Sequence, residues 1–327
     1  PPHARPLVSQ QNTTLRFSTR TRYNPPMHAV VTNRLRKSYG HHEALRGIDL
    51  RVPAGSLYGF LGPNGAGKTT TLRILMGLLR ASGGSATVLD QDCWRDGARL
   101  RRDVGYLPGD IRLYGNMTGR STLAFFDSAR GTQSRDQINR LAKVLDLDLA
   151  KRVRDYSRGM KQKLGLIQAL MHRPELLILD EPTTGLDPLM QTTLHEELRH
   201  AADEGRTVLF SSHSLGEVEQ LCNMVGILRE GLLIEQAKIE TLRARAIRRV
   251  EIVFTESGKA HTLPKGLHVL QEHDRRLEGS WVGPVQDLLK WLVETSVREV
   301  MITPPDLEDL FLAYYANGTP GTAEESS

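Results

Sequence analysis

The chain has 327 residues, of which 39% are hydrophobic and 25% charged, a composition typical of a globular protein with two ordinary domains. No apolar run reaches the ~18 residues that a membrane-spanning helix needs, so the sequence predicts none. The formal net charge of +5 is mild and indicates a solvated basic surface rather than a strong nucleic-acid or membrane site. Two widely separated cysteines, Cys93 and Cys222, suit a reducing compartment and predict neither a disulfide framework nor a metal site.

Both ends of the chain have the composition of disordered tails. Residues 1–27 carry five prolines with scattered Arg and Thr, and the first acidic residue of the chain is Glu43. This segment faintly resembles an organellar transit peptide, but we favour an extended or misassigned start ahead of Met27. Residues 317–327 form the second predicted tail.

After the first tail, the pattern alternates as it does in antiparallel strands. Apolar residues recur at Val30, Val31, Ile48, Leu50 and Val52. They lead to a short buried strand at 57–61 and a helix at 70–79.

The middle of the chain predicts a helix-rich region followed by a parallel sheet. Residues 97–172 have helical spacing with polar interruptions. Residues 176–179 and 207–210 are apolar runs typical of buried parallel strands, and a helix at about 188–203 completes a β–α–β unit.

The pattern changes near Arg245, where we place a domain boundary. A strand at 250–254, a helix at 285–297 and a strand at 300–302 follow, and a last helix runs from Pro304 to about Tyr315. These elements predict a separate small α+β domain over residues 246–316.

The most informative motif follows the predicted strand at 57–61. It has the form G-x-x-x-x-G-K-T and comprises Gly62, Pro63, Asn64, Gly65, Ala66, Gly67, Lys68 and Thr69. Glycines allow backbone N–H groups to surround phosphates, Lys68 supplies a point charge, and the Thr69 hydroxyl can ligate Mg²⁺. A chance match is the alternative, and the strand before and helix after the motif argue against it. The sequence therefore predicts a nucleoside triphosphatase.

An acidic pair, Asp180 and Glu181, follows the apolar run at 176–179. Mg²⁺ binds beside a phosphate loop at a carboxylate that ends a buried strand, so Asp180 is the predicted metal ligand. Glu181 is placed to polarise the attacking water as a general base. An acidic pair with no role is the alternative, and the phosphate loop upstream argues against it.

Further motifs follow one another along the chain. They are Tyr39 in a Lys-Ser-Tyr-Gly run, the stretch from Tyr156 to Gln162, the loop from Thr184 to Asp187, and the Ser211-Ser212-His213 run. Together with the phosphate loop and the acidic pair, this ordered set resembles the ATP-binding subunits of ABC transporters. Each motif also has a structural alternative: a packed strand residue for Tyr39, a helix cap and turn for Ser157 and Gly159, and a structural histidine for His213.

The resemblance assigns roles to these residues. It implies that Tyr39 stacks on adenine and that Thr70 binds the nucleotide beside the phosphate loop. It implies that Ser157 and Gly159, at the start of a helix, face the γ-phosphate held by a partner subunit. It further implies that Asp187 lies in the loop crossing the dimer interface and that His213 is the switch histidine at the γ-phosphate.

The resemblance covers residues 28–245 and implies an α/β fold, the P-loop NTPase cassette of ABC proteins. Such a cassette has a mixed sheet core, an antiparallel β subdomain and a helical subdomain, here at about 111–172. The α+β domain at 246–316 resembles an accessory domain that is thought to help dimerisation or regulation.

The sequence departs from the family pattern at two motifs. The family usually has a glutamine after Gly-Tyr-Leu-Pro, which touches Mg²⁺ and water, whereas Gly109 and Asp110 stand here. We hypothesise that Asp110 replaces that glutamine as a metal ligand. In the signature, Tyr156, Arg158 and Met160 replace the commoner Leu, Gly and Gln. These variants are similar to those of drug and antibiotic exporters related to the daunorubicin-resistance ATPases.

The implied function is ATP hydrolysis with Lys68, Glu181 and His213 as catalytic residues and with ATP and Mg²⁺ as cofactors. The expected partners are a separately encoded polytopic permease, which exports drug- or lipid-like molecules, and a second copy bound head to tail; no nucleic acid is expected. The subunit would lie at the cytoplasmic face of the membrane. The alternative is a soluble ABC ATPase acting on ribosomes or nucleic acid, which usually carries two cassettes or a long coiled coil. A non-hydrolysing sensor would lack Lys68 or Glu181, and both are present.

Overall fold

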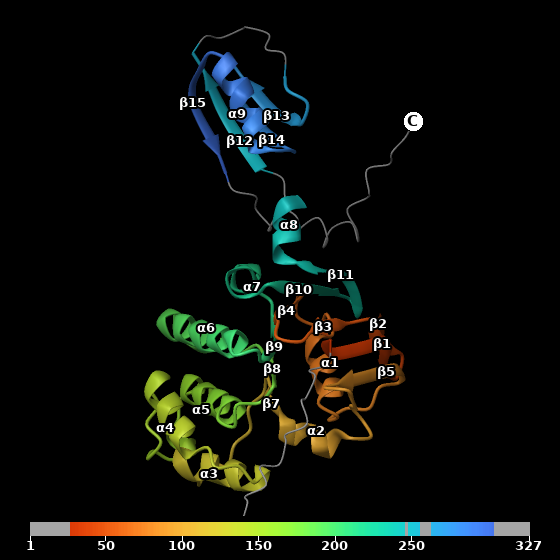
Figure 1. Cartoon of the computed structure of the whole chain (residues 1–327), viewed down its shortest axis with the longest axis vertical. Helices are drawn as coiled ribbons and strands as arrows, with labels where there is room; N and C mark the ends of the chain where they lie inside the picture. Colours follow the sequence, from red (N-terminus) through yellow and green to blue (C-terminus); the bar gives the residue numbers. More distant parts are fainter. Residues whose placement is uncertain (1–26, 246–247, 256–262, 304–327) are drawn as a thin grey trace, which may run out of the picture.

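The computed structural model describes residues 27–303 apart from 246–247 and 256–262, and these residues form three sheets with surrounding helices (Figure 1). Within these ranges no helix is both long and apolar enough to cross a membrane. The predicted tails, except for Met27, and the predicted helix from Pro304 to Tyr315 lie outside the described residues.

A six-stranded mixed sheet, in the order β11-β10-β4-β9-β8-β7, forms the centre of the cassette region. Its strands are β4 (Leu57–Leu61), β7 (Val104–Leu107), β8 (Leu176–Asp180), β9 (Thr207–Ser212), β10 (Met224–Arg229) and β11 (Leu232–Lys238). All neighbours pair in parallel except β10 and β11. Every residue of β4, β8 and β9 is buried, as in parallel strands covered on both faces. The carboxyl ends of these three strands therefore lie side by side.

An antiparallel sheet covers one side of this centre. Its strands are β1 (His28–Tyr39), β2 (His42–Ile48), β3 (Arg51–Pro53), β5 (Gly83–Val88) and β6 (Gln91–Asp92). Helix α1 (Lys68–Leu75) packs against both sheets, because its Leu72 shares a buried cluster with Val30 of β1 and Tyr58 of β4. The antiparallel strands predicted from the alternation at 30–52 are confirmed, whereas β5 and β6 were not predicted.

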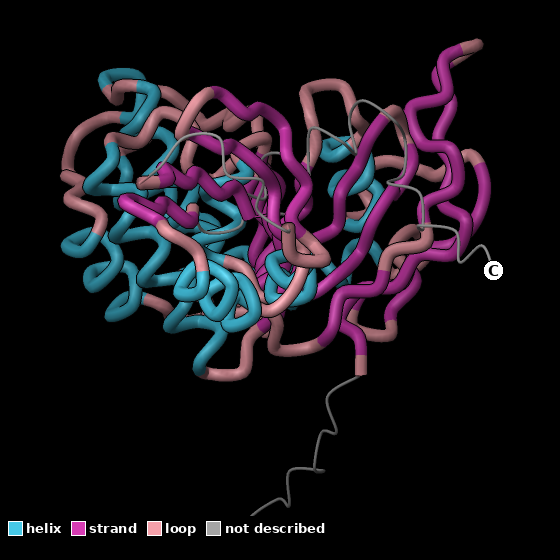
Figure 2. Tube along the Cα trace, turned by 90° about the horizontal axis from the view of Figure 1, so that it is seen from above, coloured by secondary structure: helices cyan, strands magenta, loops and turns pink. Residues whose placement is uncertain are grey.

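Four helices lie on the side of the central sheet opposite the antiparallel sheet (Figure 1). They are α3 (Gly119–Arg130), α4 (Arg135–Val144), α5 (Arg158–Leu170) and α6 (Pro188–Asp203), while α2 (Gly97–Asp103) precedes β7 and α7 (Leu215–Leu221) follows β9. Viewed from above, the helices concentrate on one side and the strands on the other (Figure 2). The helix predicted at 188–203 is confirmed. The prediction that 97–172 is helix-rich is confirmed, whereas the short strand β7, whose four residues pair with β8, was not predicted.

A third sheet, in the order β13-β14-β12-β15, follows helix α8 (Ile239–Arg245). Its strands are β12 (Arg248–Phe254), β13 (Leu267–His273), β14 (Arg276–Trp281) and β15 (Val297–Ile302), and α9 (Val285–Glu294) packs on it. The sheet has a core of its own, in which Ile252, Trp281 and Leu288 are buried together. The predicted strands at 250–254 and 300–302 and the helix from 285 are confirmed, but the hairpin of β13 and β14 was missed. The domain boundaries at 28, 245 and 316 stay predictions.

Candidate nucleotide-binding site

The phosphate loop joins the end of β4 to the start of α1. Gly65 and Gly67 have φ angles of 83° and 106°, a left-handed conformation that a side chain would strain. A Cβ on Gly67 would also lie 2.7 Å from Leu45 Cδ2 and 2.9 Å from the Ala44 carbonyl oxygen. The loop therefore requires glycine at this position for both backbone and packing reasons.

Lys68 is the first residue of α1 and is only 6% exposed. Its ammonium donates hydrogen bonds to the carbonyl oxygens of Gly62 at 2.6 Å and Pro63 at 3.2 Å. It also lies 3.5 Å from Glu181 Oε1. The loop thus holds a buried positive charge beside the Glu181 carboxylate, which follows β8, two strands away in the sheet.

A cavity of about 310 Å³ opens over the loop. Its lining comprises Tyr39, His42, Ala44, Pro63, Asn64, Gly65, Gly67, Lys68, Thr69, Thr70 and Glu181. The half-exposed ring of Tyr39 lies at this cavity, with Lys37 Nζ 5.1 Å from its centroid. His42 and Ala44 were not predicted to belong to the site. Both lie at the start of β2, the strand that follows Tyr39.

Asp180 ends β8 and is 1% exposed. Its Oδ1 accepts a hydrogen bond of 2.6 Å from the Ser211 hydroxyl of β9. Its Oδ2 is buried and has no hydrogen-bond partner among the described residues. An orphaned carboxylate oxygen inside a protein is costly, and a hard cation with oxygen ligands would satisfy it. Asp180 therefore fits the metal-ligand role predicted for it.

Glu181 follows Asp180 with a φ of 50°, a strained left-handed backbone for a residue with a side chain. Two neighbours hold this backbone: its N–H donates to Ser211 Oγ at 3.0 Å, and the Gln162 amide donates to its carbonyl oxygen at 3.2 Å. Gln162 also donates to the carbonyl of Pro182 at 2.9 Å. These contacts fix the direction of the Glu181 side chain.

The Glu181 carboxylate contacts both of the other predicted catalytic residues, Lys68 and His213. Its Oε1 lies 3.5 Å from Lys68 Nζ, and its Oε2 lies 2.7 Å from Nδ1 of His213. Glu181 and His213 directly follow β8 and β9, and Lys68 begins the helix after the phosphate loop that follows β4. The sheet topology therefore assembles a lysine, a carboxylate and an imidazole at one edge.

Comparison with known proteins identifies the family. A family profile described as "ABC transporter" matches residues 45–184. The bacitracin transport ATP-binding protein BcrA of Bacillus licheniformis is 33% identical over 302 residues, which cover 89% of this chain and 99% of that protein. The chain belongs to the ATP-binding subunits of ABC transporters.

Other relatives agree with this assignment. The daunorubicin resistance ATP-binding protein DrrA3 of Streptomyces coeruleorubidus is 34% identical, over 87% of this chain and 95% of that protein. A solved ATP-binding subunit of an ABC transporter is 27% identical with a TM-score of 0.63, over 66% of this chain and 92% of that one. The predicted ABC cassette fold, the nucleotide and the ATPase activity are confirmed, and the family branch is that of drug and antibiotic exporters.

The signature of this ABC subunit lies at the start of α5. Ser157 caps the helix by accepting a hydrogen bond of 3.2 Å from the Met160 N–H. Gly159 is pressed against the loop after β8, since a Cβ there would lie 2.7 Å from the Gly185 carbonyl oxygen. Asp187 caps α6 through a 3.0 Å bond from the Met190 N–H. Ser157, Gly159 and Asp187 do not line the cavity over their own phosphate loop.

Asp110, the hypothesised metal ligand, lies on the surface. Its carboxylate is 63% exposed and accepts a hydrogen bond of 2.9 Å from Arg112 Nε. Gly109 instead approaches the orphaned oxygen, since a Cβ on it would lie 3.0 Å from Asp180 Oδ2. The metal role of Asp110 stays a prediction.

If Asp110 supports the metal, replacing it with alanine should raise the Mg²⁺ concentration for half-maximal ATP hydrolysis by about 10-fold, as outer partners of metal sites do. Asp155→Ala is the matched control, because Asp155 is also an exposed aspartate paired with a neighbouring arginine. Unchanged Mg²⁺ dependence in a Mg²⁺ titration of Asp110→Ala would remove Asp110 from the site.

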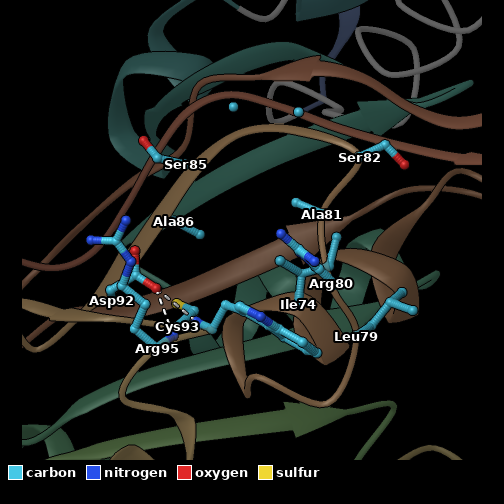
Figure 3. A pocket seen from close by; sticks show the side chains of 13 residues that line it. Ile74, Leu79, Arg80, Ala81, Ser82, Ser85, Ala86, Asp92, Cys93 and Arg95 are labelled. Atoms are coloured by element: carbon cyan, nitrogen blue, oxygen red, sulfur yellow. Dashed lines mark hydrogen bonds between the residues drawn. The ribbon is translucent and has the colours of Figure 1, made fainter.

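A second cavity, of about 350 Å³, lies beside β5 and α1 and shares no residue with the first (Figure 3). Cys93 lines it, and burial, with a smaller contribution from Asp92, raises the pKa of this thiol to about 12. Cys93 is therefore a protonated packing residue at neutral pH. Trp94 also lines this cavity and is 52% exposed, 5.8 Å from the Arg80 guanidinium.

Proposed function

We propose that this subunit energises a separately encoded polytopic permease, which exports drug- or lipid-like molecules, from the cytoplasmic face of the membrane. The relatives support the substrate class, because bacitracin transport and daunorubicin resistance are the activities named for proteins that match almost end to end. The observation that carries the ATPase part is the contact of Glu181 with both Lys68 and His213.

In this proposal each side chain has a defined task. Lys68 binds the β- and γ-phosphate oxygens as a point charge, and the loop N–H groups surround them. Glu181 accepts the proton of the attacking water, while His213 holds the Glu181 carboxylate and contacts the γ-phosphate. Tyr39 stacks on adenine, and Thr70 lies beside the phosphates.

Thr69 and Asp180 are the residues that would hold Mg²⁺. The buried Oδ2 of Asp180 supports this, since it lacks a partner within the described ranges. When bound, the ion neutralises negative charge on the phosphate oxygens.

We further propose that two copies bind head to tail and enclose two ATP molecules. Ser157 and Gly159 support this arrangement, because they lie at the N-terminus of the 13-residue helix α5 and yet do not line the cavity of their own chain. The first backbone N–H groups of a helix have no partner within the helix, so a helix N-terminus binds anions. The γ-phosphate of the partner's ATP would fit there. ATP binds the closed dimer better than the open one, and this difference drives the conformational change.

Copurification tests the permease. The tagged chain is expected to bring down one polytopic membrane protein in stoichiometric amount from detergent-solubilised membranes of its native host. A chain tagged in the same way but unrelated in sequence is the control. Recovery of ribosomal proteins or nucleic acid, without a membrane protein, would overturn the transport proposal and leave only the ATPase.

A further inference from the structure

A buried carboxylate lies next to the segment that carries His213. Glu217 belongs to α7, and its side chain is only 12% exposed. Its Oε2 accepts a hydrogen bond of 2.5 Å from the Ser212 hydroxyl, and its Oε1 lies 3.5 Å from Nε2 of His195. Glu217 is part of neither the phosphate loop, the acidic pair nor the signature, and it does not line the nucleotide cavity.

The partners of Glu217 come from the segments that carry the site. Ser212 precedes His213, and its oxygen also accepts a hydrogen bond of 2.9 Å from the Ser214 N–H. The loop around His213 is therefore held from both sides by the pair of Ser212 and Glu217.

The second segment is helix α6, which follows the acidic pair and the interface loop along the chain. His195 lies on α6, the helix that Asp187 caps. One carboxylate thus contacts the residue before the switch histidine and the helix that follows the interface loop.

These contacts favour a charged carboxylate in the interior. Burial raises the pKa of Glu217, but the contacts with His195 and Ser212 outweigh burial and leave the pKa below its ordinary value. A buried charge strengthens the hydrogen bond that it accepts. The position of the His213 loop therefore depends on this charge.

We propose that Glu217 is a positioning residue that holds the His213 loop against helix α6, so that His213 meets Glu181. This inference rests on the proposed roles of His213 and Glu181. None of the contacts of Glu217 described above involves the phosphate loop. Replacing Glu217 should therefore change the rate of ATP turnover and not the affinity for ATP.

Steady-state kinetics separate these effects. Replacing Glu217 with glutamine removes the charge and keeps the shape, and kcat is expected to fall about 10-fold, the effect of one hydrogen bond to a charged group. The KM for MgATP and the binding of a fluorescent ATP analogue should stay within about 2-fold of wild type. Glu217→Ala should lower kcat further at unchanged KM, so glutamine acts as a partial rescue.

The matched control is Glu219→Gln, on the same helix two residues away. Glu219 faces α8, where it pairs with Arg243, and it should tolerate the change without loss of kcat. An unchanged kcat in Glu217→Gln, or a rise in KM equal to the fall in kcat/KM, would overturn the proposal. A lower melting temperature with unchanged kcat would also overturn it, because it would assign Glu217 a purely structural role.

A double variant separates failure of this inference from failure of the proposed function. In a His213→Ala background, Glu217→Gln should have little further effect, because coupled residues act through one arrangement. Equal losses from Glu217→Gln in both backgrounds would overturn the positioning role. If His213→Ala alone leaves kcat unchanged, the proposed role of His213 fails, and the inference fails with it. If only Glu217→Gln leaves kcat unchanged, the inference fails and the role of His213 stands.

Discussion

Replacing Glu181 with glutamine should stop ATP hydrolysis and trap an ATP-bound dimer. The amide keeps the size of the side chain but cannot accept the proton of the attacking water, so kcat is expected to fall about 10²- to 10⁴-fold. It also removes a negative charge that lies 3.5 Å from Lys68 and beside the expected γ-phosphate, which favours the bound nucleotide. Phosphate release measures the first effect, and size-exclusion chromatography at saturating ATP measures the second.

Glu175→Gln is the control for this experiment. Glu175 immediately precedes β8, its side chain is exposed, and its carboxylate takes no part in the contacts of the site. Hydrolysis near the wild-type rate in Glu181→Gln would exclude Glu181 as the general base. A variant that is monomeric at saturating ATP would contradict the closed dimer.

Two inactive variants should restore activity when they are mixed. Lys68→Met removes the buried positive charge, and Gly159→Ala inserts a Cβ 2.7 Å from the Gly185 carbonyl oxygen, which displaces the start of α5. Each alone should lower kcat/KM about 10²- to 10³-fold, as loss of one preorganised electrostatic contact does. If the phosphate loop of one chain works with the signature of the other, a mixed dimer contains one intact site and hydrolyses ATP again.

The control mixes each variant with itself at the same total concentration. Activity should then stay at the level of the single variants. A mixed sample with no more activity than either variant alone would mean that Lys68 and Gly159 serve the same site within one chain. That result would refute the head-to-tail arrangement while leaving the roles of the individual residues intact.

The chemistry of the site could be predicted because each motif occurs in a fixed structural context. A phosphate loop needs a strand before it and a helix after it, and both are present as β4 and α1. The contacts of Glu181 with Lys68 and with His213 follow from parallel strands whose carboxyl ends meet at one edge. These expectations depend on the order of strands along the chain, which apolar runs reveal.

Other features depend on partners that sequence patterns do not specify. β7 is a four-residue strand whose pairing with β8 is set by the tertiary fold, so the local sequence did not predict it. Asp110 pairs with Arg112, two residues further along, and spacing alone could not show in which direction its carboxylate turns. Glu217 gave no signal, because it meets its partners only when β9, α6 and α7 pack together.

Gln162 has a consequence for a dimer as a whole. Gln162 belongs to α5, whose start would bind the γ-phosphate of one ATP. Its amide donates hydrogen bonds to the backbone carbonyls of Glu181 and Pro182. Glu181 would act on the other ATP, the one bound by its own phosphate loop. A shift of α5 when nucleotide binds would therefore change the position of Glu181, the proposed general base, in the same chain. The two nucleotides of such a dimer would be energetically coupled through a single amide in each chain, and ATP would act cooperatively on its own hydrolysis.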